Sequence, residues 1–219
     1  MKISCILSSL VFLCASLAME GAEIKLDSIV VVEDTKLAYV YDSQGRVVKE
    51  TILDWSHNDE RWEKEEKNEY KYDASGNMTL HEYYVWESDL EAWFCVEKYE
   101  NSYNSAGFKT SSKEYEWSDA EEELELIEEV RFTYEKGMLV LEEYLEEVSE
   151  EIGWAVWMKI TYEYDGDHRM IKKTATELNY TMEWVGDEME EFAYDEYDNL
   201  VMNASYFWDN EKDLWSGMY

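Results

Sequence analysis

The sequence predicts an all-β protein, an antiparallel meander of about twelve strands built from six two-stranded repeats of about 31 residues. An aromatic doublet followed by an acidic or amide residue recurs at nearly fixed spacing. The segments between doublets alternate in polarity, and the chain contains no proline to interrupt a strand ladder. A sheet of this many strands is expected to twist or curl.

The second tyrosine of the doublet defines the repeat. Successive copies lie 31, 31, 31, 30 and 30 residues apart, and a fixed period of about 20–50 residues is typical of arrays and solenoids. We therefore divide the chain into a signal peptide over 1–18, an N-terminal lead-in over 19–37 and a repeat array over 38–219, whose sixth copy either ends in a shortened strand or is cut off where the given sequence stops. The aligned tyrosines are Tyr41, Tyr72, Tyr103, Tyr134, Tyr164 and Tyr194.

A turn follows each doublet, and its chemistry is clearest in the first copy. Asp42 opens a type I turn by accepting from nearby backbone N–H groups, and Gly45 takes the left-handed conformation that closes a bulged hairpin. In the sixth copy a short polar residue, Asp198 or Asn199, fills the glycine position. Altered turns are expected in the fourth and fifth copies, which have Gly137 and His168 there.

The turn leads into an alternating strand, which in four of the six copies ends at a tryptophan. This tryptophan lies 14 residues after the aligned tyrosine in four copies, and a second follows seven residues later in three of them. The polar residues between them indicate a second hairpin, in which cross-strand aromatic pairs would each add about 0.2–1 kcal/mol. The members are Trp55, Trp62, Trp86, Trp93, Trp117, Trp208 and Trp215, with Leu124 as the second member in the third copy.

Two acidic segments leave a helical alternative open. Residues 121–130 and 139–152 are rich in Glu and Leu, and Leu141, Leu145 and Val148 recur at helix-like spacing. Both segments lie where other copies have strand patterns. Because propensity is the weaker signal, we expect strands there.

The first 18 residues are typical of a secretory signal peptide. Lys2 gives the positive start, residues 3–17 are uncharged, and the small residues Ser16 and Ala18 precede the cleavage point. Lipidation at Cys14 is the alternative, but the residue before it is a leucine where a small residue is needed, so simple cleavage is favoured. The expected location is secreted, periplasmic or on the outer cell surface.

The mature chain is strongly acidic. Without Lys2 it has 18 basic and 52 acidic residues, a net charge of −34. Such a surface repels phosphate backbones and lipid headgroups, which argues against nucleic acid and an anionic membrane surface as partners. The 10 Trp, 18 Tyr and 6 Phe predict an ordered protein and not a charged tail.

No catalytic or cofactor constellation stands out in the sequence. Cys95 is the lone cysteine of the mature chain and is expected to be a buried, inert thiol. His57, His81 and His168 occupy unrelated repeat positions without metal-ligand spacing. We expect a non-enzymatic protein with no cofactor and no dedicated metal site. The alternatives are a carbohydrate-active enzyme using a carboxylate pair, and a structural envelope protein that tolerates calcium at its Asp-rich turns over 165–167 and 195–199.

The pattern Y-x-Y-D-x-x-G-[NR], present as YVYDSQGR and YKYDASGN, resembles the YD-repeat (Rhs-like) motif of bacterial surface and toxin-shell proteins. With its signal peptide and tryptophan-rich period, the chain is also similar to secreted bacterial repeat proteins of unknown function. The resemblance covers Tyr39 to the end and implies an antiparallel β architecture and an extracytoplasmic address. It implies no catalytic residue. YD repeats of shell-forming proteins are shorter, and six copies are too few to close a large shell.

The aromatic rows are the candidate binding surface, either packed as a core or exposed as a platform for sugar rings or peptides. We expect a secreted or surface-exposed, non-enzymatic scaffold that binds a polysaccharide or an envelope protein through aromatic stacking. Its oligomeric state is open. The candidate ligand-binding residues are Trp55, Trp62, Tyr84, Trp86, Trp93, Tyr115, Trp117, Tyr206, Trp208 and Trp215.

Overall fold

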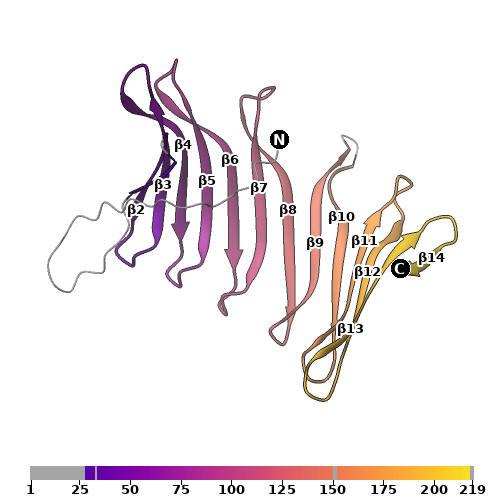
Figure 1. Ribbon diagram of the computed structural model, residues 1–219. Coiled ribbons are helices and arrows are strands. Elements are labelled where there is room, and N and C mark those ends of the chain that lie inside the picture. The colour runs from indigo at the N-terminus through magenta and orange to yellow at the C-terminus, as the bar shows by residue number, and fades with distance from the viewer. Residues whose placement is uncertain (1–27, 33, 150–151, 218–219) are drawn as a thin grey trace. The chain divides into compact units, whose positions relative to one another are not determined.

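The structure, a computed structural model, describes residues 28–32, 34–149 and 152–217 (Figure 1). The predicted signal peptide and most of the lead-in lie outside this range. Fourteen antiparallel strands follow one another in chain order in a single meander sheet. The all-β prediction is therefore confirmed, and in the two segments with a helical alternative residues 123–130 and 139–149 are strand. Among the described residues there is no helix with the length and apolarity needed to span a bilayer.

The strands have the following bounds. The first seven are β1 (Ser28–Val32), β2 (Thr35–Tyr41), β3 (Val47–Ser56), β4 (Arg61–Tyr72), β5 (Met78–Glu87), β6 (Ala92–Tyr103) and β7 (Lys109–Ser118). The other seven are β8 (Glu123–Glu135), β9 (Met138–Ser149), β10 (Gly153–Tyr164), β11 (Met170–Leu178), β12 (Trp184–Tyr194), β13 (Leu200–Asp209) and β14 (Leu214–Gly217).

Two strands exceed the predicted number. The twelve predicted strands are β2 to β13, two per repeat. The added strands are β1, which lies in the predicted lead-in and pairs with β2, and β14, which contains the predicted Trp215 and pairs with β13. The array begins with β2 at Thr35, slightly before the predicted boundary.

The described residues form two compact units, those up to residue 99 with 116–124, and residues 100–115 with those from 125 onward. We call them the N-terminal unit and the C-terminal unit. The division falls within β6, β7 and β8. Within each unit, successive strands are rotated relative to one another, the twist expected of antiparallel strands (Figure 1).

The first hairpin turn has the predicted geometry in the first, fourth and sixth copies. In the first copy the Asp42 Oδ1 accepts from the backbone N of Gln44 at 2.8 Å and of Arg46 at 3.0 Å, while Gly45 has a φ of 86°. Asp198, with a φ of 63°, fills the glycine position in the sixth copy. The fourth copy has the expected altered turn, a two-residue connection between β8 and β9 in which Lys136 and Gly137 both have positive φ.

The prediction of an altered turn in the fifth copy is wrong. His168 has a φ of 66°, and its N–H donates to Asp165 O at 3.2 Å, as Gly45 donates to Asp42 O at 3.1 Å. Histidine is one of the few residues other than glycine that occupies this region with some frequency. The Asp165 side chain accepts from the backbone of Asp167 and Arg169 and holds the standard turn without a glycine at the left-handed position.

The second hairpin of each repeat also uses a left-handed residue, and here it is usually acidic. Glu60, Glu91, Glu122 and Asp213 have φ values of 52°, 49°, 54° and 54°. All lie 19 residues after their aligned tyrosine, and Gly153 takes the same place in the fourth copy. The repeat therefore fixes the backbone of both hairpins.

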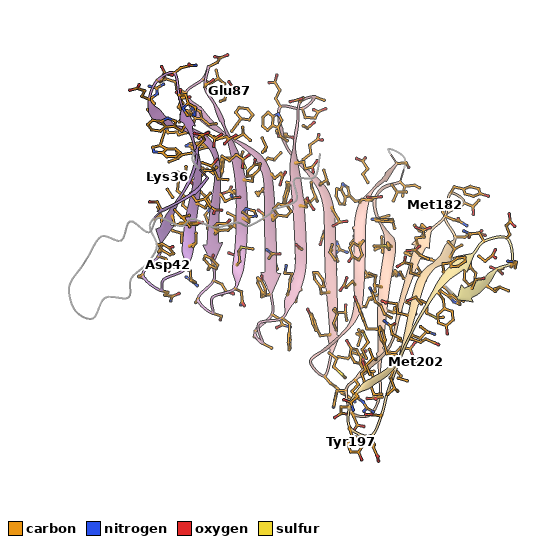
Figure 2. All side chains as sticks on the ribbon, in the orientation of Figure 1. Lys36, Asp42, Glu87, Met182, Tyr197 and Met202 are labelled. Carbon is orange, nitrogen blue, oxygen red and sulfur yellow. The ribbon has the colours of Figure 1, made fainter. Side chains whose placement is uncertain are left out.

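The sheet has a thin core. The only apolar side chains with under a tenth of their surface exposed, in the part of the chain described, are Val130, Leu145, Ala175 and Met189 of the C-terminal unit. Side chains extend along the whole length of the strands, from Asp42 at one end of the N-terminal unit to Glu87 at the other (Figure 2). Stability in such a layer comes from strand hydrogen bonds and contacts between neighbouring side chains on each face.

Candidate ligand-binding surface

The two faces of the N-terminal unit are chemically different. Directly paired residues share a face, and the pairs Trp55 with Trp62 and Leu53 with Lys64 place tryptophan and lysine together. A bulge in β4 then brings Lys67 onto the same face, opposite Tyr84 of β5. We call this side of β2 to β6 the tryptophan face. The opposite side, the tyrosine face, contains Tyr39, Tyr70, His81, Tyr83 and Tyr99.

The predicted tryptophan pairs are confirmed in three hairpins. Their ring centroids are 5.3 Å apart in the first, 5.1 Å in the second and 5.2 Å in the sixth, all edge-to-face. This geometry lets the positive edge of one indole meet the negative face of the other. The pairs are Trp55 with Trp62, Trp86 with Trp93, and Trp208 with Trp215. In the third copy Trp117 instead contacts Phe94, at 4.7 Å.

Two lysines cover the aromatic rings of the tryptophan face. The Lys64 ammonium lies 3.8 Å from the centroid of the Trp86 ring. Lys67 lies 3.7 Å from the Tyr84 centroid and 5.3 Å from the Trp93 centroid, and it is only 7% exposed. An ammonium over an aromatic face gains about 0.5–2 kcal/mol from the ring quadrupole. Sequence reasoning missed both lysines, although Lys64 has the same strand parity as Trp62.

An open groove of about 710 Å³ separates the first two tryptophan hairpins. Pairing between β4 and β5 ends at Glu66 and Val85. Beyond that point β4 continues into the hairpin with β3, and β5 into the hairpin with β6, so the strand ends diverge. The groove is lined by Arg61, Trp62, Glu63, Lys64, Glu65, Val85, Trp86, Ser88 and Glu91.

Stacked rings and carboxylates cover the tyrosine face. His81 lies between Tyr70 and Tyr99, with centroid distances of 4.9 and 5.6 Å and nearly parallel rings. Its Nε2 is 2.7 Å from the Asn68 Oδ1. Burial lowers the pKa of His81, although the nearby carboxylates of the same face act in the opposite direction. This histidine therefore packs as a neutral ring in a stack.

The remaining predicted residues take structural roles in the C-terminal unit. The Tyr115 hydroxyl donates to Glu100 at 2.9 Å, and the Tyr206 hydroxyl donates to Glu191 at 3.2 Å. Trp208 and Trp215 lie over the backbone of Gly186, where a Cβ would come within 2.9 Å of both rings. Of the ten predicted binding residues, the structure thus brings Trp62 and Trp86 together around one groove.

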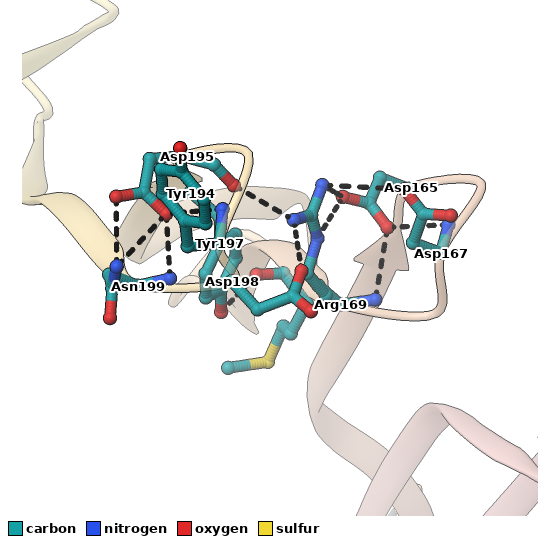
Figure 3. Close-up of polar contacts among 9 residues, drawn as sticks. Asp165, Asp167, Arg169, Tyr194, Asp195, Tyr197, Asp198 and Asn199 are labelled. Atoms are coloured by element: carbon teal, nitrogen blue, oxygen red, sulfur yellow. Dashed lines mark hydrogen bonds and ion pairs between the residues drawn. The ribbon is translucent and has the colours of Figure 1, made fainter.

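The Asp-rich turns are occupied by protein donors. Arg169 extends between the turns of the fifth and sixth copies, pairing with Asp165 at 2.8 Å and with Asp198 at 2.6 Å (Figure 3). Asp195 accepts from the backbone and side chain of Asn199. These hydrogen bonds lower the pKa of Asp165 and Asp195. In the described residues no group of three or more His, Cys, Asp or Glu side chains is placed to hold a metal ion.

One carboxyl pair is close enough to share a proton. Burial and a hydrogen bond with Asp54 raise the pKa of Glu65. Glycosidase carboxyls are about 5–9 Å apart, which leaves room for the scissile bond and water, whereas hydrogen-bonded carboxyls have no such space between them. Cys95 is half-buried, which corrects the expectation of a buried thiol, and this burial raises its pKa.

Comparison with known proteins shows that this chain is similar in fold to several solved structures. Residues 19–97 match the model of DUF3836, a family of unknown function, and no curated protein matches the chain. A DUF3836 family protein from Bacteroides vulgatus is 24% identical with a TM-score of 0.36, covering 43% of this chain and 92% of that one. A protein of unknown function from Bacteroides fragilis is 19% identical with a TM-score of 0.47, covering 62% of this chain and 96% of that one.

A further similarity is to a much larger chain. The TcdB2-TccC3-TEV structure is 15% identical with a TM-score of 0.61 and covers 93% of this chain, which corresponds to 9% of that one. The order and direction of strands in this chain are thus similar to those of one segment of that assembly.

Proposed function

We propose that the chain is a secreted, non-enzymatic β-repeat scaffold that binds a polysaccharide by aromatic stacking in the groove between its tryptophan hairpins. One observation carries the proposal: Trp62 and Trp86, from different hairpins, line the same open groove. A pyranose ring presents an apolar C–H face that packs on an indole, and its hydroxyls need polar partners at the edges. Ser88 and Glu91 supply such partners here.

The groove is pre-formed because the indole on each of its two sides packs against a second indole of its own hairpin. Trp55 packs edge-to-face against Trp62, and Trp93 packs in the same way against Trp86. The side chain of Lys64 is solvent-exposed and can swing away from the Trp86 ring when a sugar stacks there. Little conformational entropy would be lost at the two indoles on binding.

The repeat makes a linear polymer a better ligand than a single sugar. A second shallow hollow, lined by Phe94, Trp117, Asp119 and Glu122, lies one repeat further along the same unit. Equivalent positions in neighbouring repeats are two strands apart, about 10 Å. This spacing, together with the YD-type turn that we propose organises each copy, presents aromatic rings at regular intervals along the sheet.

Affinity electrophoresis in polysaccharide-containing gels tests the proposal. We expect the protein to be retarded by at least one glycan, and Trp62→Ala or Trp86→Ala to abolish the retardation. Trp184→Ala is the matched control, because Trp184 is also an exposed indole beneath a lysine, Lys159, but belongs to the C-terminal unit. Unchanged retardation of Trp86→Ala would refute the site. If no glycan retards the protein, an envelope protein becomes the favoured partner, and release of reducing ends would favour the carboxylate-pair enzyme.

A further inference from the structure

The lysines of the N-terminal unit are gathered on one face of the sheet. On β2 to β5, the tryptophan face carries five lysines and two glutamates. The lysines are Lys36, Lys49, Lys64, Lys67 and Lys71, and the glutamates are Glu69 and Glu82. This face has a net positive charge within a mature chain whose net charge is −34.

The tyrosine face of the same strands has the opposite character. Its only cation, among the described residues of β2 to β5, is Arg61 at a strand end, which pairs with Glu63 at 3.0 Å. The acids there are Glu50, Asp54, Glu63, Glu65, Glu66 and Glu87. The charges are therefore sorted between two faces of one sheet layer.

Of these five lysines only Lys64 lines the groove, whose other charged residues are Arg61, paired with Glu63 at 3.0 Å, Glu65, hydrogen-bonded with Asp54, and Glu91. Lys67 is buried and its Nζ already pairs with Glu69 at 2.8 Å, so its contribution is structural. Lys64 is exposed, lies in the groove wall and contacts the Trp86 ring. A carboxylate next to a stacked sugar ring would meet this ammonium, and a charge-assisted hydrogen bond of this kind is about twice as strong as a neutral one.

We infer that the polysaccharide bound in this groove is anionic, with carboxylates or sulfates on its sugar rings, and that Lys64 pairs with one of them. The inference rests on the proposed function and assigns the ligand class of the same groove. The acidity of the whole chain does not oppose it at physiological salt, where exposed charges more than about 8 Å apart are largely screened. The direct contact with Lys64 is shorter than that and persists.

The competing explanation is that the lysines only cover aromatic surface in a thin sheet, as long basic side chains often do. The two explanations differ in what Lys64 should do to binding. If Lys64 only covers the aromatic surface, the protein binds neutral and acidic polymers with equal affinity. If Lys64 pairs with the ligand, the protein binds acidic polymers more tightly than neutral ones, and this preference is lost when the charge of Lys64 is removed.

Isothermal titration of the full mature chain at 0.15 M salt distinguishes them, with polygalacturonate as the carboxylate probe, dextran sulfate as the sulfate probe and dextran as the neutral probe. We expect one anionic probe to bind at least fivefold more tightly than dextran, Lys64→Gln to remove most of this preference, and Lys64→Glu to abolish anionic binding. Lys212→Gln, an exposed lysine of the C-terminal unit, should bind like the wild type.

Each result has a clear reading. Equal binding of dextran and the anionic probes, or wild-type binding by Lys64→Gln, overturns the inference while the proposed function stands. Binding of none of the three, together with no retardation by any glycan, overturns the proposed function as well. Affinity that falls as salt is raised from 0.15 to 0.5 M supports the inference without relying on any variant.

Discussion

The guanidinium of Arg46 lies over the ring of Tyr72, 4.5 Å from its centroid, and links the turns of the first two repeats. Its Nε donates to the Asp42 carboxylate of its own turn at 2.7 Å, and its Nη1 donates to Asp73 O of the next turn at 3.4 Å. The Tyr72 hydroxyl in turn donates to Val47 O at 2.8 Å. The aligned tyrosine is thus part of a clamp between neighbouring turns.

The clamp recurs with different chemistry. Arg169 lies 5.1 Å from the Tyr194 centroid and bonds Asp195 O, which repeats the first arrangement. Phe108 occupies the equivalent position in the third copy and stacks on Tyr134 with centroids 4.9 Å apart. In the first, third and fifth copies this position thus holds a flat group that covers the next tyrosine, either a guanidinium or a phenyl ring.

We predict that Arg46→Ala destabilises the protein by about 1–2 kcal/mol, since it removes a partly buried ion pair and the cation–π contact. Arg46→Phe should retain a larger part of the stability, because Phe108 already stacks in this way on Tyr134. Urea unfolding followed by tryptophan fluorescence measures both. Arg61→Ala is the control for an exposed arginine paired within one strand. Equal losses for Arg46→Ala and Arg61→Ala would show that the clamp contributes nothing.

We predict that Glu91→Gly stabilises the protein by about 0.5–1 kcal/mol, because Glu91 has a φ of 49°, a region that is strained for residues with a Cβ. Gly153 already occupies this position in the fourth copy. Glu87→Gly, four residues earlier within β5, should destabilise, since glycine in a strand only adds entropy to the unfolded chain. Urea midpoints that move in the same direction for both variants would contradict this reasoning.

The sequence predicted most of the strands because their signals are local. Asp42 and Gly45 specify a turn within four residues, and the alternation that ends at Trp55 defines a strand by itself. The position of Lys67 could not be predicted. Strict alternation from Trp62 would put it on the tyrosine face, and a bulge after Lys64 moves it to the tryptophan face.

The groove could be predicted only in part, for a similar reason. The W-x6-W spacing indicated that Trp62 and Trp86 belong to separate hairpins, and that much is correct. Their approach around one cavity depends on where pairing between β4 and β5 ends, at Glu66 and Val85. Strand separation of this kind is set by the twist of two neighbouring hairpins, and no short sequence pattern encodes it.

Alkaline pH should destabilise the fold through its half-buried tyrosines. Burial, together with a hydrogen bond to Glu66, raises the pKa of Tyr83 to about 12, and burial with Glu100 does the same for Tyr115. The unfolded phenol titrates near about 10. A raised folded pKa means that the contribution to stability is fully present below about pH 10 and is lost as pH rises from about 10 towards 12.

The measurement is the free energy of urea unfolding between pH 8 and 11, with absorbance at 295 nm to follow phenol ionisation. Tyr83→Phe should flatten the decline above about pH 10. Tyr180→Phe, which removes a phenol that is 98% exposed, is the control. A decline of equal slope in Tyr83→Phe and the wild type would rule out this contribution.

Gly186→Ala tests whether Trp208 and Trp215 are packed as part of the fold. A Cβ on this residue would lie 2.7 Å from Trp208 Cε3 and 2.8 Å from Trp215 Cζ2, closer than carbon atoms can approach. The indoles would have to move, and overpacking of this kind costs about 1–3 kcal/mol. We expect a lower urea midpoint and an altered tryptophan emission spectrum. Gly166→Ala, where nothing lies within 4 Å of the added Cβ, should leave both unchanged. A wild-type midpoint for Gly186→Ala would mean that the two indoles are free to leave this surface, and they would then become candidates for ligand contact alongside Trp62 and Trp86.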